Sequence, residues 1–104
     1  MARYGYTRIA WDSSYRKWIL LNSTDLQIVD WFLNEVKKRV PACKYTAQKL
    51  SPGKPYSVTI EKLKPSAEGD AQAIAYWATG QLGQEGWEPF AAGGGVIDLR
   101  KKYE

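Results

Sequence analysis

The chain has 104 residues, with 15 Lys and Arg against 11 Asp and Glu, one cysteine and no histidine. This length suits one domain spanning residues 1–104 around a single core. The absence of histidine and the lone Cys43 exclude histidine-based acid–base catalysis, Cys/His zinc sites, haem ligation and an internal disulfide framework. Cysteine usage predicts a reducing cytoplasmic location, and no apolar run is long enough to span a membrane.

The charges are distributed unevenly along the chain. Residues 1–64 carry 12 Lys and Arg and 5 Asp and Glu, a net charge of +7. Residues 65–99 carry no Lys or Arg and five acidic residues, and residues 100–104 add back +2. A basic N-terminal part and a basic end therefore flank an acidic segment. The alternative interpretation is ordinary solvated surface.

The first predicted unit is a β-hairpin. Residues 4–11 and 15–22 are rich in aromatic and β-branched residues and flank the polar turn 12–14. Alternation places Thr7, Ile9 and Trp11 on one face of the first strand, and Tyr4, Tyr6 and Arg8 on the other. Residues 18–21 are apolar on both faces, which predicts a central strand covered on both sides.

A helix is predicted to follow, from a Thr24–Gln27 capping box to about Arg39, before the helix-breaking Pro41. Its apolar stripe consists of Leu26, Val29, Leu33, Val36 and Val40, with Phe32 at the edge. Trp31 lies nearly opposite this stripe. We therefore expect Trp31 to be exposed in a monomer.

Residues 44–50 and 56–64 predict a second hairpin around the Pro/Gly turn 51–55. A second helix should open at Pro65-Ser66 and stop at Gly86, a natural left-handed terminator. Its narrow stripe consists of Ala71, Ile74, Ala75, Ala78 and Leu82. Tyr76 lies off the stripe.

A third hairpin is predicted from residues 87–92 and 96–103, joined by Gly93, Gly94 and Gly95. The element order is therefore ββα-ββα-ββ. Hairpins followed by helices predict an α+β fold, an antiparallel sheet of five to six strands with two helices on one face.

The helix end and the strand entry carry a motif, Leu82-Gly83-Gln84-Glu85-Gly86-Trp87-Glu88. Together with the preceding strand and the following hairpin, it resembles the small DUF4177-type domains, in which a helix ending in leucine leads through Gly-Trp-Glu into a strand. The resemblance covers about residues 56–103. It implies the fold of that part and brings no activity or catalytic residue. Pro89 departs from the aliphatic residue of the family, which predicts an irregular or edge strand.

The candidates for catalysis have ordinary structural explanations. Glu85 and Glu88 flank a predicted helix end, and Glu68 and Asp70 lie at a helix start, where the dipole stabilises acids. Cys43 lies beside Lys44 but lacks a histidine base. We expect no catalytic residue, no metal site, no cofactor and no enzymatic activity.

Aromatic and basic residues together give the strongest binding signal. The predicted ligand-binding residues are Arg8, Trp11, Tyr15, Arg16, Lys17, Trp18, Gly93, Gly94, Gly95 and Arg100. Tyr4, Tyr6, Lys101, Lys102 and Tyr103 can lie on adjacent strands. Aromatic rings stack on bases and Arg and Lys neutralise phosphates, although aromatics are also good strand formers.

Three hypotheses follow. The first is a non-enzymatic oligomeric binding protein that holds a small anionic, nucleotide-like ligand with its first hairpin and the glycine loop. The second is single-stranded nucleic-acid binding by the same surface. The third is a protein-interaction adaptor that uses Trp31, Tyr76 and the outer helix faces. A bare sheet face also predicts self-association into a homodimer or larger ring, with no membrane partner.

Overall fold

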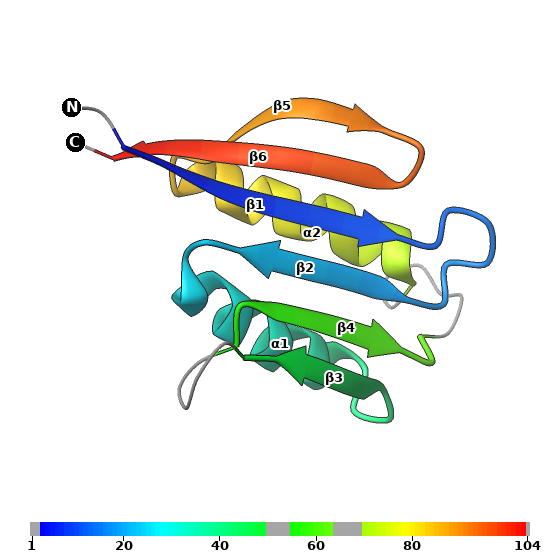
Figure 1. Ribbon diagram of the computed structural model, residues 1–104. Helices are drawn as coiled ribbons and strands as arrows, with labels where there is room; N and C mark the ends of the chain where they lie inside the picture. The colour runs from blue at the N-terminus through cyan, green and yellow to red at the C-terminus, as the bar shows by residue number, and fades with distance from the viewer. Residues whose placement is uncertain (1–2, 50–54, 64–69, 104) are drawn as a thin grey trace.

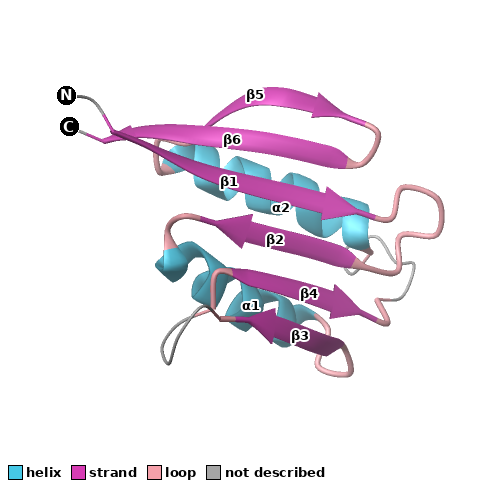
Figure 2. Ribbon diagram, viewed as in Figure 1, coloured by secondary structure: helices cyan, strands magenta, loops and turns pink. Residues whose placement is uncertain are grey.

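Six antiparallel strands form one open sheet, and two helices cover one of its faces (Figures 1 and 2). The computed structural model describes residues 3–49, 55–63 and 70–103. The elements are β1 (Arg3–Trp11), β2 (Ile19–Ser23), α1 (Leu26–Arg39), β3 (Lys44–Gln48), β4 (Ser57–Glu61), α2 (Ala71–Gln84), β5 (Glu88–Gly93) and β6 (Val96–Tyr103). The strand order is β3-β4-β2-β1-β6-β5. The predicted α+β fold is confirmed.

The core lies between the sheet and the helices. Ile9 of β1 is fully buried and lies opposite Leu21 of β2 and Ile97 of β6. The same alternation buries Thr7, whose hydroxyl is 2.8 Å from that of Ser23, so this polar pair is satisfied inside the core. The other face of the sheet carries no helix in the described part of the chain, and we call it the open face.

The first hairpin is confirmed, but its second strand is shorter than predicted. Residues 15–18 belong to a loop, in which Arg16 adopts a positive φ of 58° that breaks the strand. The prediction of a strand covered on both sides was wrong. β2 is central in the sheet, yet Leu20 points to the open face and stays half-exposed.

Helix α1 ends at Arg39, as predicted, but begins with a different cap. The carboxylate of Asp25 accepts the backbone N–H of Gln27, while the Thr24 hydroxyl accepts the N–H of Tyr6 instead. Thr24 therefore ties the helix entry to β1. Leu26 was predicted in the buried stripe, but it is the first residue of the helix and is 39% exposed.

Helix α2 begins at Ala71 with Asp70 as its cap, since the Asp70 carboxylate accepts the N–H of Ala73. The predicted opening at Pro65-Ser66 lies outside the described residues. The narrow stripe is confirmed: Ala71, Ile74, Ala75, Ala78 and Leu82 are all buried. Gly86 ends the helix with φ of 93°, as predicted. Each helix has 14 residues, and neither has the length and apolar character needed to cross a membrane.

The last hairpin turns at Gly94 and Gly95, whose φ values of 62° and 82° suit a tight two-residue turn. β5 is an edge strand, and its pairing with β6 shifts register between Pro89 and Ala91. The edge position and irregularity predicted from Pro89 are confirmed.

Candidate functional site

The predicted ligand-binding residues fall in two separate places. Arg8 and Arg100 lie on the open face, on β1 and β6. The residues of the loop 12–18 lie at the end of the sheet where β1 meets the Gly94-Gly95 turn. The carbonyl of Gly95 accepts the N–H of Trp11 at 2.8 Å, so the loop and the turn do meet. The structure therefore brings the loop and the glycines together, but separates them from the two arginines.

Trp11 does not suit the role of a stacking residue. Its side chain is 7% exposed and belongs to the core, where its ring meets that of Tyr76 edge-on at 5.8 Å between centroids. Its indole Nε1 is buried without a hydrogen-bond partner among the described residues. A buried ring presents no face to a ligand, so the expectation that Trp11 stacks is corrected. Composition placed Trp11 with the ligand, although the alternation along β1 already put it on the same face as Thr7 and Ile9, which is the buried face.

Three backbone N–H groups of the loop 12–18 already donate hydrogen bonds to a side chain of the same loop, that of Asp12. The Asp12 carboxylate accepts the N–H groups of Ser14 and Tyr15, both at 3.1 Å, and that of Lys17 at 3.4 Å. The N–H of Tyr15 is the main cause that lowers the pKa of Asp12. These amides are arranged as in an anion-binding site, but the anion that they bind is the Asp12 carboxylate itself. Tyr15 and Trp18 remain exposed, at 73% and 41%.

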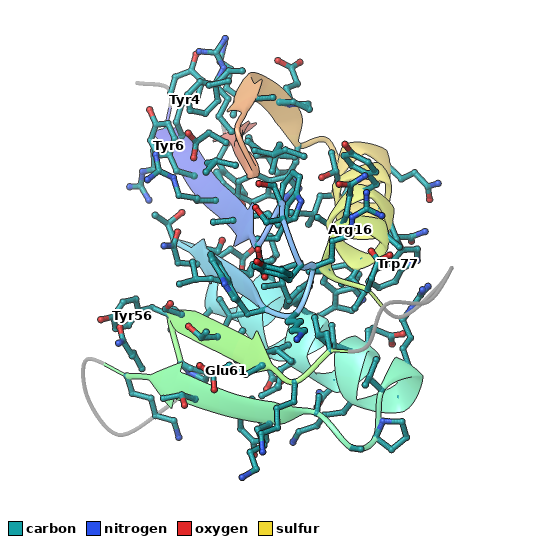
Figure 3. All side chains as sticks on the ribbon, turned by 90° about the vertical axis from the view of Figure 1, so that its right-hand side faces the viewer. Tyr4, Tyr6, Arg16, Tyr56, Glu61 and Trp77 are labelled. Atoms are coloured by element: carbon teal, nitrogen blue, oxygen red, sulfur yellow. The ribbon has the colours of Figure 1, made fainter. Side chains whose placement is uncertain are left out.

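Arg16 makes two contacts with the start of helix α2. Its guanidinium lies 3.7 Å from the carboxylate of Asp70, and its carbonyl accepts the N–H of Ala71. Figure 3 shows Arg16 on the helix side of the molecule, away from Tyr4 and Tyr6.

The open face carries an aromatic and cationic group that we call the open-face cluster: Tyr4, Tyr6, Phe90 and Arg100. The three rings are 47%, 51% and 49% exposed. Tyr6 and Phe90 meet edge-on, with 6.2 Å between centroids. The Arg100 guanidinium lies 5.9 Å from the ring centre of Tyr4 and 5.6 Å from that of Phe90. Figure 3 shows Tyr4, Tyr6 and Tyr56 on the side of the sheet opposite the helices.

A hollow of about 750 Å³ continues from this cluster across β1 and β2. Its lining includes Tyr6, Arg8, Asn22, Tyr56, Phe90 and Asp98. Arg8 and Asp98 form a two-point ion pair, with Nε–Oδ1 at 2.7 Å and Nη2–Oδ2 at 3.1 Å. The hydrogen bond that Arg8 donates to Asp98 raises the pKa of Arg8, which keeps the guanidinium charged. The volume lies in the range of small-molecule sites, and the lining combines rings with a few polar groups.

 Trp31 was expected to be exposed, but it is half-buried against the core. Its ring stacks on that of Trp77 from α2, with 5.3 Å between centroids and 24° between planes. The Arg39 guanidinium covers Trp77 at 4.2 Å. We call Trp31 and Trp77 the seam pair, because they close the seam between the two helices. The expectation of an exposed Trp31 is corrected, whereas Tyr76 is 58% exposed on α2.

The remaining reactive groups give little support for catalysis. Cys43 is half-buried, and burial raises the pKa of its thiol, so the thiolate is disfavoured at neutral pH. Among residues 3–49, 55–63 and 70–103, no three His, Cys, Asp or Glu side chains group as metal ligands do.

Comparisons with protein-family models, curated proteins and solved structures gave no match. The resemblance to DUF4177-type domains therefore stays a prediction.

The sequence interpretation missed three residues of the open face: Phe90, Tyr56 and Asp98. Phe90 was within reach of sequence reasoning, because alternation from the outward Glu88 puts it on the same face. Asp98 alternates with Arg100 along β6, but only the pairing of β6 with β1 places it opposite Arg8. Tyr56 was not within reach, since only the tertiary structure brings it into the same hollow.

Proposed function

We propose that this chain is a non-enzymatic module that binds single-stranded nucleic acid with its open face. The observation that carries the proposal is the open-face cluster, in which three half-exposed rings lie together and two of them, Tyr4 and Phe90, contact one guanidinium group. Bases stack on such rings whatever their identity, and each stacked base contributes about 1–3 kcal/mol.

The position of the rings supports stacking. Tyr4 and Tyr6 are two residues apart on β1, and Phe90 approaches Tyr6 from β5, so the rings follow one another across the sheet. No helix covers them in the described part of the chain. An extended strand of bases can therefore lie flat on this surface, as it does on other sheet-based binding modules.

The cations of the same face supply contacts to phosphate. Arg100 and Lys102 lie on β6 opposite Tyr6 and Tyr4, and Arg8 lies on β1. Two acids lie among them: Asp98 holds Arg8, and Glu88 lies opposite Arg100 in the register. The local charge is only mildly positive, so we expect moderate affinity and a shallow salt dependence of one or two phosphate contacts.

A mononucleotide site at the loop 12–18 has less support. Trp11 is buried, Arg16 is held by Asp70, and the loop amides are occupied by Asp12. These contacts leave Tyr15, Lys17 and Trp18 as accessible side chains without an arrangement that converges on one ligand. That hypothesis stays a prediction, as does self-association through the open face.

Fluorescence anisotropy with labelled oligothymidine and oligouridine tests the proposal, at low and at physiological salt. The variant Tyr6→Ala with Phe90→Ala should weaken binding by about 2 kcal/mol or more, because two stacking faces are lost. The matched control is Tyr45→Ala. Its ring is 47% exposed like that of Tyr4, but it lies on the helix side under Lys37.

For the proposal to hold, the Tyr6/Phe90 variant must bind oligonucleotides more weakly than the Tyr45 variant. Equal affinity of the Tyr6/Phe90 variant and the wild type would exclude the open face as the binding surface. An equal loss of binding in the Tyr45 control would show that the effect is not specific to the open face, and would also contradict the proposal. No binding of either oligonucleotide by the wild-type chain at low salt would end the proposal.

A further inference from the structure

The two edges of the sheet differ in how they are protected against another strand. At one edge, β5 contains Pro89 and a register shift, and both hinder pairing with a further strand. At the other edge, β3 pairs with β4 from Lys44 to Gln48 without a shift, and Lys44–Gln48 contains no proline. An edge strand leaves alternate N–H and C=O groups unpaired. The edge of β3 is therefore a regular template for one more strand.

The surroundings of this edge are basic. Lys37 of α1, Lys44 of β3 and the following Lys49 are exposed, and residues 36–49 contain no Asp or Glu. Lys44 is exposed on β3, and Lys37 of α1 lies 4.3 Å from the ring centre of Tyr45 on the same strand. The nearest acids in the chain are Glu35, which pairs with Lys38, and Glu61, which lies opposite Lys44. Cations therefore outnumber acids beside the free edge.

We propose that the edge of β3 binds an extended acidic peptide segment of a partner protein as an additional antiparallel or parallel strand. Backbone hydrogen bonds to the unpaired groups of β3 supply the pairing, and Lys44 and Lys37 attract the acidic side chains on the two faces. This site is independent of the nucleic-acid proposal, because β3 and the open-face cluster lie on opposite halves of the sheet.

Two other occupants fit this edge less well. A second copy of the chain would bring Lys37 and Lys44 close to their own counterparts, and lysines on an edge strand discourage such pairing. A nucleic-acid strand would find cations but on β3 a single exposed ring, that of Tyr45, which Lys37 covers. The described open-face positions of β3 and β4 are Lys44, Thr46, Gln48, Ser57, Thr59 and Glu61.

The test uses a fluorescein-labelled peptide of alternating glutamate and valine, with anisotropy as the readout. Two further peptides carry N-methyl groups on one or the other set of alternate residues. A strand donates to its neighbour from only one set of amides, so methylation of that set should weaken binding by about tenfold, while methylation of the other set should leave it unchanged. A lysine–valine peptide should not bind.

Protein variants and amide shifts locate the site. Lys44→Gln should weaken binding of the glutamate–valine peptide by about two- to fivefold, whereas Lys102→Gln on β6 should leave that binding unchanged. Peptide addition should shift the amide resonances of Tyr45–Gln48 and leave those of β5 in place. The proposal is overturned if both methylated peptides bind like the parent, or if the shifts fall on β5 or on the open face.

Discussion

The open-face cluster and the seam pair are built from the same kinds of side chain but have different environments. Each combines aromatic rings with one arginine: Arg100 lies between Tyr4 and Phe90, and Arg39 covers Trp77. The seam pair is half-buried and stacked between two helices. The rings of the open face are about half exposed, and no helix of the described chain lies over them.

This difference in exposure predicts that substitutions in the two clusters have different effects. The seam pair joins α1 to α2 and removes apolar surface from water, so a substitution there should lower the free energy of unfolding. The open-face rings are about half exposed and contribute less to folding, so a substitution there should lower the affinity for oligonucleotides. Three predictions test that separation, in addition to the binding experiments above.

The largest effect is expected for Trp31→Ala. Removing one ring of the seam pair should lower the free energy of unfolding by about 2 kcal/mol, less than for a fully buried tryptophan because Trp31 is half-exposed. Urea denaturation followed by circular dichroism measures this loss. Oligonucleotide affinity should be unchanged below the transition.

Tyr4→Ala is the matched comparison and should show the reverse pattern. Its stability should stay within about 0.5 kcal/mol of wild type, while oligonucleotide binding weakens. If Trp31→Ala and Tyr4→Ala lose the same stability, the two clusters do not differ in the way described.

A smaller effect is expected for the arginines. Arg100→Gln should weaken oligonucleotide binding by about three- to tenfold and reduce the salt slope by about one, because one phosphate contact is lost. Arg39→Gln should leave the affinity unchanged and cost at most about 1 kcal/mol of stability through the lost contact with Trp77. An equal loss of affinity in both variants would show that only the overall charge matters.

The smallest effect is expected from the loop 12–18. The pKa of Asp12 is lowered from its ordinary value of 3.8, mainly by the N–H of Tyr15. A lowered pKa in the folded state means that the carboxylate stabilises the loop above the unfolded pKa, and that this contribution is lost as the pH falls through the folded value. We expect the Tyr15 and Lys17 amide resonances to be constant near neutral pH and to move only below about pH 4.

Asp12→Asn supplies the control for this titration, since the low-pH change should disappear. The variant should bind oligonucleotides like the wild type, because the loop lies away from the open-face cluster. A clear change in oligonucleotide affinity would instead show that the loop 12–18 contributes to the binding surface.

Much of the fold was predictable because it depends on local periodicity. The inward face of β1, the stripe of α2 and the terminator Gly86 are each set by residues close in sequence, and the structure confirms them. The same reasoning was wrong for Trp31. A position opposite the stripe of one helix becomes half-buried when a second helix lies beside it, and the spacing within α1 contains no information about α2.

The candidate site was predictable only in its composition. The sequence alone determined that the chain has rings and cations but no histidine, together with the elements that carry them. Only the tertiary structure decided which rings are accessible. Strand pairing brings Phe90 beside Tyr6 and places Arg100 between two rings, while it buries Trp11 under α2. Exposure depends on contacts between residues distant in sequence, and these form only when the sheet and helices come together.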